Sequence, residues 1–111
     1  MLFRSTQCPV AVPAERRLAV TEFLTRANYG MIVGNFEFDV ADGDLRFKTF
    51  LDLGPEPALE GLPPFARLFG QIVGANLSAM DRYLPGIVDV IAGRTPVEAL
   101  VAVEAADALP P

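Results

Sequence analysis

The 111 residues of this chain are enough for one domain with one hydrophobic core, and their charge and composition exclude several kinds of function. A net charge of −5 argues against a surface that binds nucleic acid or anionic lipid, and the absence of histidine removes the commonest general base and metal ligand. With 51% hydrophobic residues, the chain has an apolar excess, which suggests that part of its surface is buried against another subunit.

Residues 2 to 12 are predicted to form an extended strand. β-Branched residues and alternating apolar positions favour a strand, and Pro9, which has no N–H to donate, places it at a sheet edge or near a strand end. Cys8 falls in this segment, where we expect a small buried apolar group rather than a nucleophile.

The following segment predicts a helix that Pro13 begins and Asn28-Tyr29-Gly30 ends. Glu15 lies in its first turn, where the helix dipole favours an acidic side chain. The apolar positions at helical spacing, which predict its buried face, are Val20, Phe23, Leu24 and Ala27.

Residues 35 to 53 predict a β-hairpin around Asp42-Gly43, which we expect to form a two-residue type I′ turn. That turn would set the facing pairs Phe38 with Phe47, Glu37 with Lys48, and Asp39 with Arg46. One face of the hairpin would then carry Phe36, Phe38, Val40, Leu45, Phe47 and Leu51. Phe50 is the large apolar residue on the charged face and is therefore a candidate contact.

The same segment holds five acidic residues, which raises the question of a metal or acid/base site: Glu37, Asp39, Asp42, Asp44 and Asp52. A calcium loop needs acids at alternate positions, then glycine and a distant glutamate, and the DVADGD run lacks that pattern. We interpret these acids as the solvated face and turn of the hairpin.

After the connector GPEPALEGLPP, the longest predicted helix begins at Pro63-Pro64 and ends at Gly93. Its apolar face is wide, so we expect the helix to be covered on two sides. Pro85 lies inside the pattern and predicts a kink near residues 81 to 85. The positions of the apolar pattern are Phe65, Leu68, Phe69, Ile72, Val73, Asn76, Leu77, Met80, Tyr83, Leu84, Ile87, Val88 and Ile91.

Gly70, Gly74 and Ser78 form a stripe of small residues beside that apolar face. Glycine destabilises a helix relative to alanine, so two glycines four residues apart indicate that another backbone comes close. We expect the domain's own sheet to be that neighbour, with a subunit contact as the alternative. Asn76 lies within the apolar face, where we expect a hydrogen-bonded core amide, with a ligand contact as the alternative.

Thr95-Pro96-Val97-Glu98 is a capping-box pattern and begins a short final helix, which we expect to pack through Val97, Leu100 and Val101. The order strand, helix, strand, strand, helix, helix predicts a single α+β domain over residues 1 to 111. Its antiparallel sheet would contain the central Asp-Gly hairpin and pack against the long kinked helix.

The chain offers little equipment for catalysis. Without histidine it has no Ser/His/Asp or Cys/His arrangement, and one cysteine cannot build a common zinc site or an internal disulfide. We therefore expect no catalytic residue, no metal site and no cofactor. The absence of a secretory signal or an uncharged run of about 18 residues leads us to expect a cytoplasmic protein that does not enter a membrane.

The run ERRLAVTEFLTRANYGMIVGNFEFDVADGDLRFKTFLDL, followed by ANLSAMDRYLPGIVDVIAG, resembles the YbjN-type proteins, which are described as bacterial sensory transduction regulators. The resemblance covers residues 12 to 100, and its specific parts are residues 28 to 39, Asp42-Gly43 and residues 80 to 85. It implies a fold similar to type III secretion chaperones, frequent homodimers and no established enzymatic activity. Family members usually carry a further helix and strand before the segment that starts here at Leu2, so we expect either a minimal member of the family or a sheet edge that a partner subunit completes.

Three hypotheses for function follow. The first is a non-enzymatic homodimeric module that binds another protein or an extended peptide, with Phe50, Gly70, Gly74 and Ser78 as its candidate surface. The second is a small-ligand sensor with an apolar pocket between the long helix and the hairpin, near Phe38, Phe47, Phe69 and Tyr83. The third, an acid or thiol enzyme using Asp and Glu or Cys8, lacks the positioned base that such a site needs.

Overall fold

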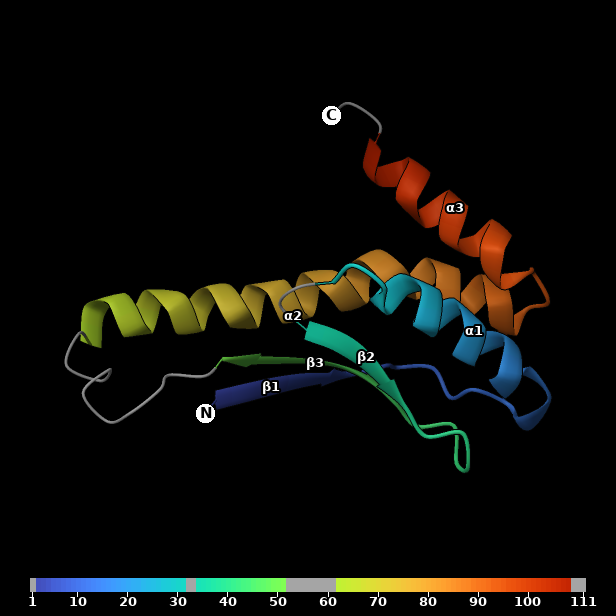
Figure 1. The fold of residues 1–111 in the computed structure, drawn as a ribbon. Helices are drawn as coiled ribbons and strands as arrows, with labels where there is room; N and C mark the ends of the chain where they lie inside the picture. Colours follow the sequence, from blue (N-terminus) through green and yellow to red (C-terminus); the bar gives the residue numbers. More distant parts are fainter. Residues whose placement is uncertain (1, 32–33, 52–61, 109–111) are drawn as a thin grey trace.

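The computed structural model describes residues 2–31, 34–51 and 62–108, which form an α+β fold, as the sequence predicts. Along the chain the elements are β1 (Leu2–Gln7), the 3-10 turn η1 (Ala14–Arg16), α1 (Arg17–Asn28), β2 (Gly34–Phe38), β3 (Leu45–Leu51), α2 (Leu62–Ile91) and α3 (Pro96–Ala108). The helices gather on one face of the sheet: α2 runs along it, α1 lies beside α2, and α3 leans away from α2 (Figure 1).

The sheet has three antiparallel strands in the order β1-β3-β2, so β1 and β2 are its edges. β1 pairs with β3 from Leu2, opposite Leu51, to Gln7, opposite Arg46. Cys8 still donates its N–H to the Leu45 carbonyl at 2.8 Å, and the pairing stops before Pro9. This end is expected because proline has no N–H to continue the ladder.

The hairpin has a four-residue loop, so the predicted two-residue turn is wrong. Asp39 donates its N–H to the Asp44 carbonyl at 2.9 Å, and Gly43 donates to the Asp39 carbonyl at 2.8 Å. Gly43 has a φ of +81°, whereas Asp42 does not take the positive φ that a type I′ turn needs.

The pairing of β2 with β3 is consequently shifted by two residues from the predicted register, with Phe38 opposite Leu45. An even shift leaves each side chain on its predicted face, and Phe36 and Phe47 are both buried. Val40 is the exception, because it lies in the loop and is exposed.

Side-chain hydrogen bonds help to shape this loop. The Asp42 carboxylate accepts the Asp44 N–H at 2.8 Å, which satisfies a loop donor locally. The Arg17 guanidinium donates to the Ala41 carbonyl at 2.9 Å and to the Val12 carbonyl at 3.2 Å, which ties the loop to the start of α1.

α1 confirms its predicted buried face. A single 3-10 turn follows Pro13, whose carbonyl accepts the Arg16 N–H at 3.0 Å, and the α-helix then runs from Arg17. The buried residues of α1 are Val20, Phe23, Leu24 and Ala27. The helix is therefore placed by its apolar spacing, as sequence periodicity alone suggested.

The core lies between the helices and the sheet, and an aromatic cluster marks its centre. The Phe36 ring meets those of Phe47 and Tyr83 edge to face, with centroids 4.8 and 5.6 Å away. Such contacts add to the roughly 2 kcal/mol that burial of each side chain of this size contributes. Other buried side chains are Val12, Val20, Phe23, Leu24, Leu45, Met80, Ile87 and Val90.

α2 is a helix of 30 residues with Pro85 inside it. It ends in a reversal at Gly93, whose φ is +116°, where Arg94 donates its N–H to the Asp89 carbonyl at 2.9 Å. The kink expected near Pro85 stays a prediction. Within the part of the chain that the structure describes, no helix is long and apolar enough to cross a membrane.

α3 begins as predicted and packs through a face that only partly matches the predicted one. Thr95 Oγ1 accepts the Glu98 N–H at 3.3 Å, which confirms the cap. Val97 and Val101 are 45% and 60% exposed, whereas Ala99 and Val103 are buried. Leu100 packs against the core and is half-buried, so the predicted face is confirmed at Leu100 and wrong at Val97 and Val101. The apolar residues of α3 have almost no preferred side, so their spacing does not select the side that meets the core.

Candidate interaction surface

The exposed flank of α2 carries the stripe of small residues that the sequence shows. Gly70, Gly74 and Ser78 are exposed, and a Cβ placed at either glycine would have nothing within 4 Å among the described residues. The expectation that these glycines pack on the domain's own sheet is therefore wrong. Leu77, on the same flank, is 45% exposed, so the apolar face of α2 extends beyond what the sheet covers. The side chain of Phe50 lies outside the described part of the chain.

The close approach that the sequence did not reveal is at Gly86. A Cβ there would lie 2.6 Å from Cζ of Phe23 and 2.9 Å from Cγ2 of Val103, so α1, α2 and α3 meet at this glycine. The sequence pattern at the neighbouring Pro85 predicts a kink and gives no sign of this contact. A lone glycine inside a long apolar pattern was the available signal.

The aromatic residues of the predicted ligand pocket are brought together only in part. Phe47 and Tyr83 are buried, and both pack on Phe36, which fills the space between them. Phe38 is half-buried at the end of β2. Phe69 lies on α2, and its side chain is outside the described part of the chain.

Asn76 is a hydrogen-bonded core amide, as predicted. Its Nδ2 donates to the Phe47 carbonyl at 3.0 Å and to Thr49 Oγ1 at 3.1 Å, while its Oδ1 accepts from Thr6 Oγ1. Asn76 and Thr49 are fully buried. This one amide ties α2 to both β1 and β3, which explains a polar residue within an apolar face.

Four of the five acidic residues of the hairpin have partners within the chain, and Asp52 lies outside the described residues. Glu37 pairs with Arg46 at 3.0 Å and with Lys48 at 3.4 Å. Asp39 accepts the Ala41 N–H, Asp42 accepts the Asp44 N–H, and Asp44 accepts from Gln7 Nε2 at 2.6 Å. Within the described residues, no group of three or more acids and cysteine is placed to hold a metal ion.

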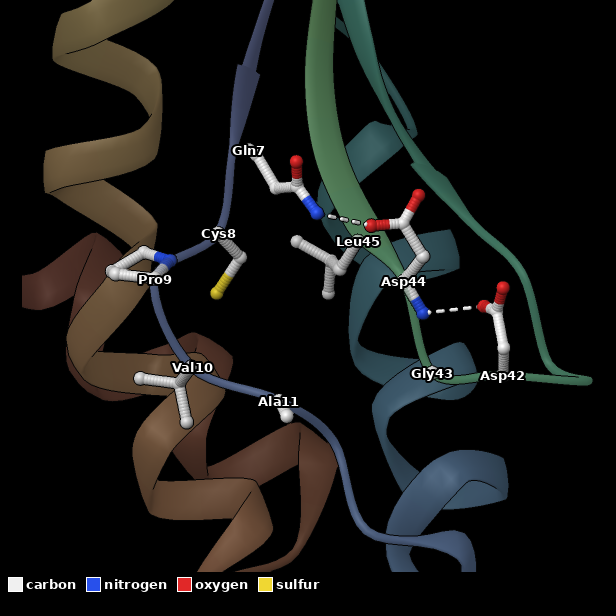
Figure 2. A pocket seen from close by; sticks show the side chains of 9 residues that line it. All are labelled: Gln7, Cys8, Pro9, Val10, Ala11, Asp42, Gly43, Asp44 and Leu45. Atoms are coloured by element: carbon white, nitrogen blue, oxygen red, sulfur yellow. Dashed lines mark hydrogen bonds between the residues drawn. The ribbon is translucent and has the colours of Figure 1, made fainter.

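An open hollow of about 550 Å³ lies between the end of β1 and the hairpin loop (Figure 2). Cys8 and Leu45 lie side by side in it, and the Gln7 side chain reaches across to Asp44. Burial raises the pKa of the Cys8 thiol, and a backbone hydrogen bond at Val10 lowers it by less. A raised pKa keeps the thiol protonated, which is the opposite of what a nucleophilic cysteine requires.

The two edges of the sheet differ. The Asn28 side chain accepts the Phe36 N–H at 2.7 Å and donates to the Phe36 carbonyl at 3.1 Å. The register makes Gly34, Phe36 and Phe38 the residues of β2 whose backbone groups face outward, and the amide occupies those of Phe36, the central one. A side chain that pairs with an edge in this way protects it from further strand addition.

Searches against protein-family models, curated proteins and solved structures find no match for this chain.

Proposed function

We propose that this chain is a non-enzymatic homodimeric module that binds another protein or an extended peptide, in the manner of the regulators and secretion chaperones that its sequence resembles. The proposal includes a cytoplasmic location and a YbjN-type, chaperone-like fold. Its partners are a second copy of the chain and an unidentified protein or peptide.

The observation that carries the proposal is the exposed flank of α2. Leu77 is 45% exposed there, and Gly70 and Gly74 leave the helix backbone open. A surface helix of a monomer usually presents polar residues to solvent, and an apolar flank of this kind favours a protein contact.

The chemistry of the described residues supports a binding role in preference to catalysis. The cysteine thiol has a raised pKa, and the hairpin acids Glu37, Asp39, Asp42 and Asp44 are engaged by neighbouring groups. An enzyme of the acid or thiol type would need a group held in a reactive protonation state.

The test is affinity capture of the tagged protein from a lysate of its source cells, with mass spectrometry and Gly74→Leu as the matched variant. Because a Cβ at position 74 would have no described atom within 4 Å, we expect this variant to keep the fold and to alter the surface of α2. A specific partner that the wild type retains and Gly74→Leu loses supports the proposal. Recovery of the same proteins by both variants contradicts the assignment of this flank.

A small-ligand sensor is the second candidate, with its pocket at a different place from the predicted one between the long helix and the hairpin. A hollow of about 380 Å³ between α2 and α3 favours this candidate. Its lining is mainly apolar and includes Pro85, Gly86, Ala102, Val103 and Ala106, with Arg82 and Asp89 beside them. A ligand that raises the melting temperature of the wild type but not of Ala102→Phe supports this reading. A metabolite screen without any shift at millimolar concentration contradicts it.

A further inference from the structure

One hydrogen bond shows which backbone groups of β1 point away from the sheet. Cys8 donates its N–H to the Leu45 carbonyl, and the register sets Thr6 opposite Phe47 two residues earlier. Hydrogen-bonded and non-hydrogen-bonded pairs alternate along an antiparallel ladder. The N–H and C=O groups of Phe3, Ser5 and Gln7 therefore face the outer edge.

We propose that a second copy of this chain adds its own β1 antiparallel to this edge, which joins the two sheets into one of six strands. This inference rests on the proposed homodimer and names its surface. The three outward residues are symmetric about Ser5, so a two-fold axis at Ser5 pairs Phe3 with Gln7 of the second copy and Ser5 with its own equivalent. That register satisfies all six outward donors and acceptors of each β1 strand.

The exposed flank of α2 that carries Leu77 would be buried between the two copies of this dimer. Leu77 precedes Gly86 by nine residues, two and a half helical turns, so it points away from the side of α2 that meets α1 and α3. α1 contacts β2, whereas α2 contacts β3 and β1, so the Leu77 flank is on the β1 side of the molecule. Two copies joined at β1 would bring these flanks face to face.

The spacing of such a dimer agrees with ordinary helix packing. Neighbouring strands are about 4.8 Å apart, and α2 lies over β1 and β3, so each α2 axis would be about one strand spacing from the two-fold axis. The two α2 helices would then lie about 10 Å apart, which is a normal distance for packed helices. Strand pairing and burial of Leu77 are thus compatible in one arrangement.

The β2 edge explains why one further copy, and not a growing series of copies, would bind at β1. Asn28 holds both backbone groups of Phe36 on β2. With β2 protected, addition at β1 closes after two copies, because a two-fold contact uses the same edge on each.

The first test is a disulfide across the proposed axis. In a Cys8→Ala background, Ser5→Cys would place two thiols on residues whose Cα atoms are about 5.5 Å apart, within the range for a disulfide. The expected result is a covalent dimer after mild oxidation. The matched control is Asn35→Cys on β2, an exposed position at the protected edge, which should remain uncrosslinked.

The second test removes the outward donor. Ser5→Pro deletes an N–H that pairing with β3 does not use, and Ser5→Ala keeps it. Because each dimer would lose two hydrogen bonds, we expect Ser5→Pro to raise the dimer dissociation constant at least about tenfold and Ser5→Ala to leave it unchanged. Circular dichroism reports whether Ser5→Pro is folded. If it is not, the crosslinking of Ser5→Cys alone tests the β1 contact.

The outcomes separate this inference from the proposed homodimer. A dimeric wild type whose Ser5→Cys variant stays uncrosslinked overturns the β1 contact and leaves the homodimer standing. A monomeric wild type overturns both. Equal crosslinking by Ser5→Cys and Asn35→Cys also overturns the β1 contact, since it reflects random collision.

Discussion

The side-chain amide of Asn28 pairs with the backbone of Phe36 through two hydrogen bonds, of 2.7 Å to its N–H and 3.1 Å from Nδ2 to its carbonyl. A residue at the end of α1 thus takes the place of a neighbouring strand on β2. The same contact anchors the connection between α1 and β2, because residues eight positions apart are held together.

Asn28→Ala should therefore weaken the fold and open the β2 edge. Loss of two partly buried hydrogen bonds should lower the free energy of unfolding by about 1–3 kcal/mol in urea titrations. The freed edge should also produce species larger than the dimer in light scattering. Asn35→Ala, an exposed neighbour on β2, is the control and should change neither. A stable Asn28→Ala protein without larger species would show that the cap has no role.

Asn76→Leu should lower the free energy of unfolding by more than a surface substitution does, although leucine is close in size to asparagine. It leaves the Phe47 carbonyl and the hydroxyls of Thr49 and Thr6 without the amide that joins them. We expect a loss of about 2–4 kcal/mol in the free energy of unfolding, measured by chemical denaturation. Gln71→Leu, on the exposed side of the same helix, should lie within about 0.5 kcal/mol of the wild type. Equal stability of the two variants would contradict this account of Asn76.

Gly86→Ala should destabilise the junction of the three helices despite the higher helix propensity of alanine. Its Cβ would lie 2.6 Å from the Phe23 ring, so we expect a loss of about 1–3 kcal/mol from overpacking. Adding Phe23→Leu should recover part of that loss, because the smaller side chain makes room, and thermal or urea unfolding of the double-mutant cycle measures this coupling. Ser78→Ala, an exposed site on α2, serves as the control. A more stable Gly86→Ala protein would refute the close approach.

Cys8 should react slowly with thiol reagents. Burial raises its pKa above the ordinary 9.0, so less thiolate is present at pH 8 than in an exposed cysteine. The raised pKa of Cys8 also makes the free energy of unfolding depend on pH. The contribution of the thiol to stability is fully present below the pKa of an ordinary thiol, and it is lost as the pH rises through the pKa of Cys8 in the folded protein. Reaction with a disulfide dye, followed from pH 7 to 9 and repeated in urea, measures this. A folded protein as reactive as the unfolded one would be inconsistent with burial.

Elements whose structure depends on one local rule were predictable from the sequence. The spacing of Val20, Phe23, Leu24 and Ala27 predicted the buried face of α1, because an amphipathic helix can turn only one side to the core. The Thr95 cap was likewise readable, since it depends on a neighbour three residues away.

Other features were not predictable because several arrangements satisfy the same local rule. Asp42-Gly43 suits both a two-residue turn and a four-residue loop with glycine at its end, and the contacts of Arg17 with the Val12 and Ala41 carbonyls lie outside the hairpin sequence. The glycine of α2 that lies close to another element was not predictable for a related reason. Gly86, rather than Gly70 or Gly74, meets another element, and which glycine does so depends on how three helices cross.

The measurement that tests the central claim most directly is sedimentation equilibrium of the wild-type protein at micromolar and higher concentrations. The proposal predicts a species of twice the 11.9 kDa chain mass that dissociates on dilution. A single species at the mass of one chain over the whole concentration range would contradict it.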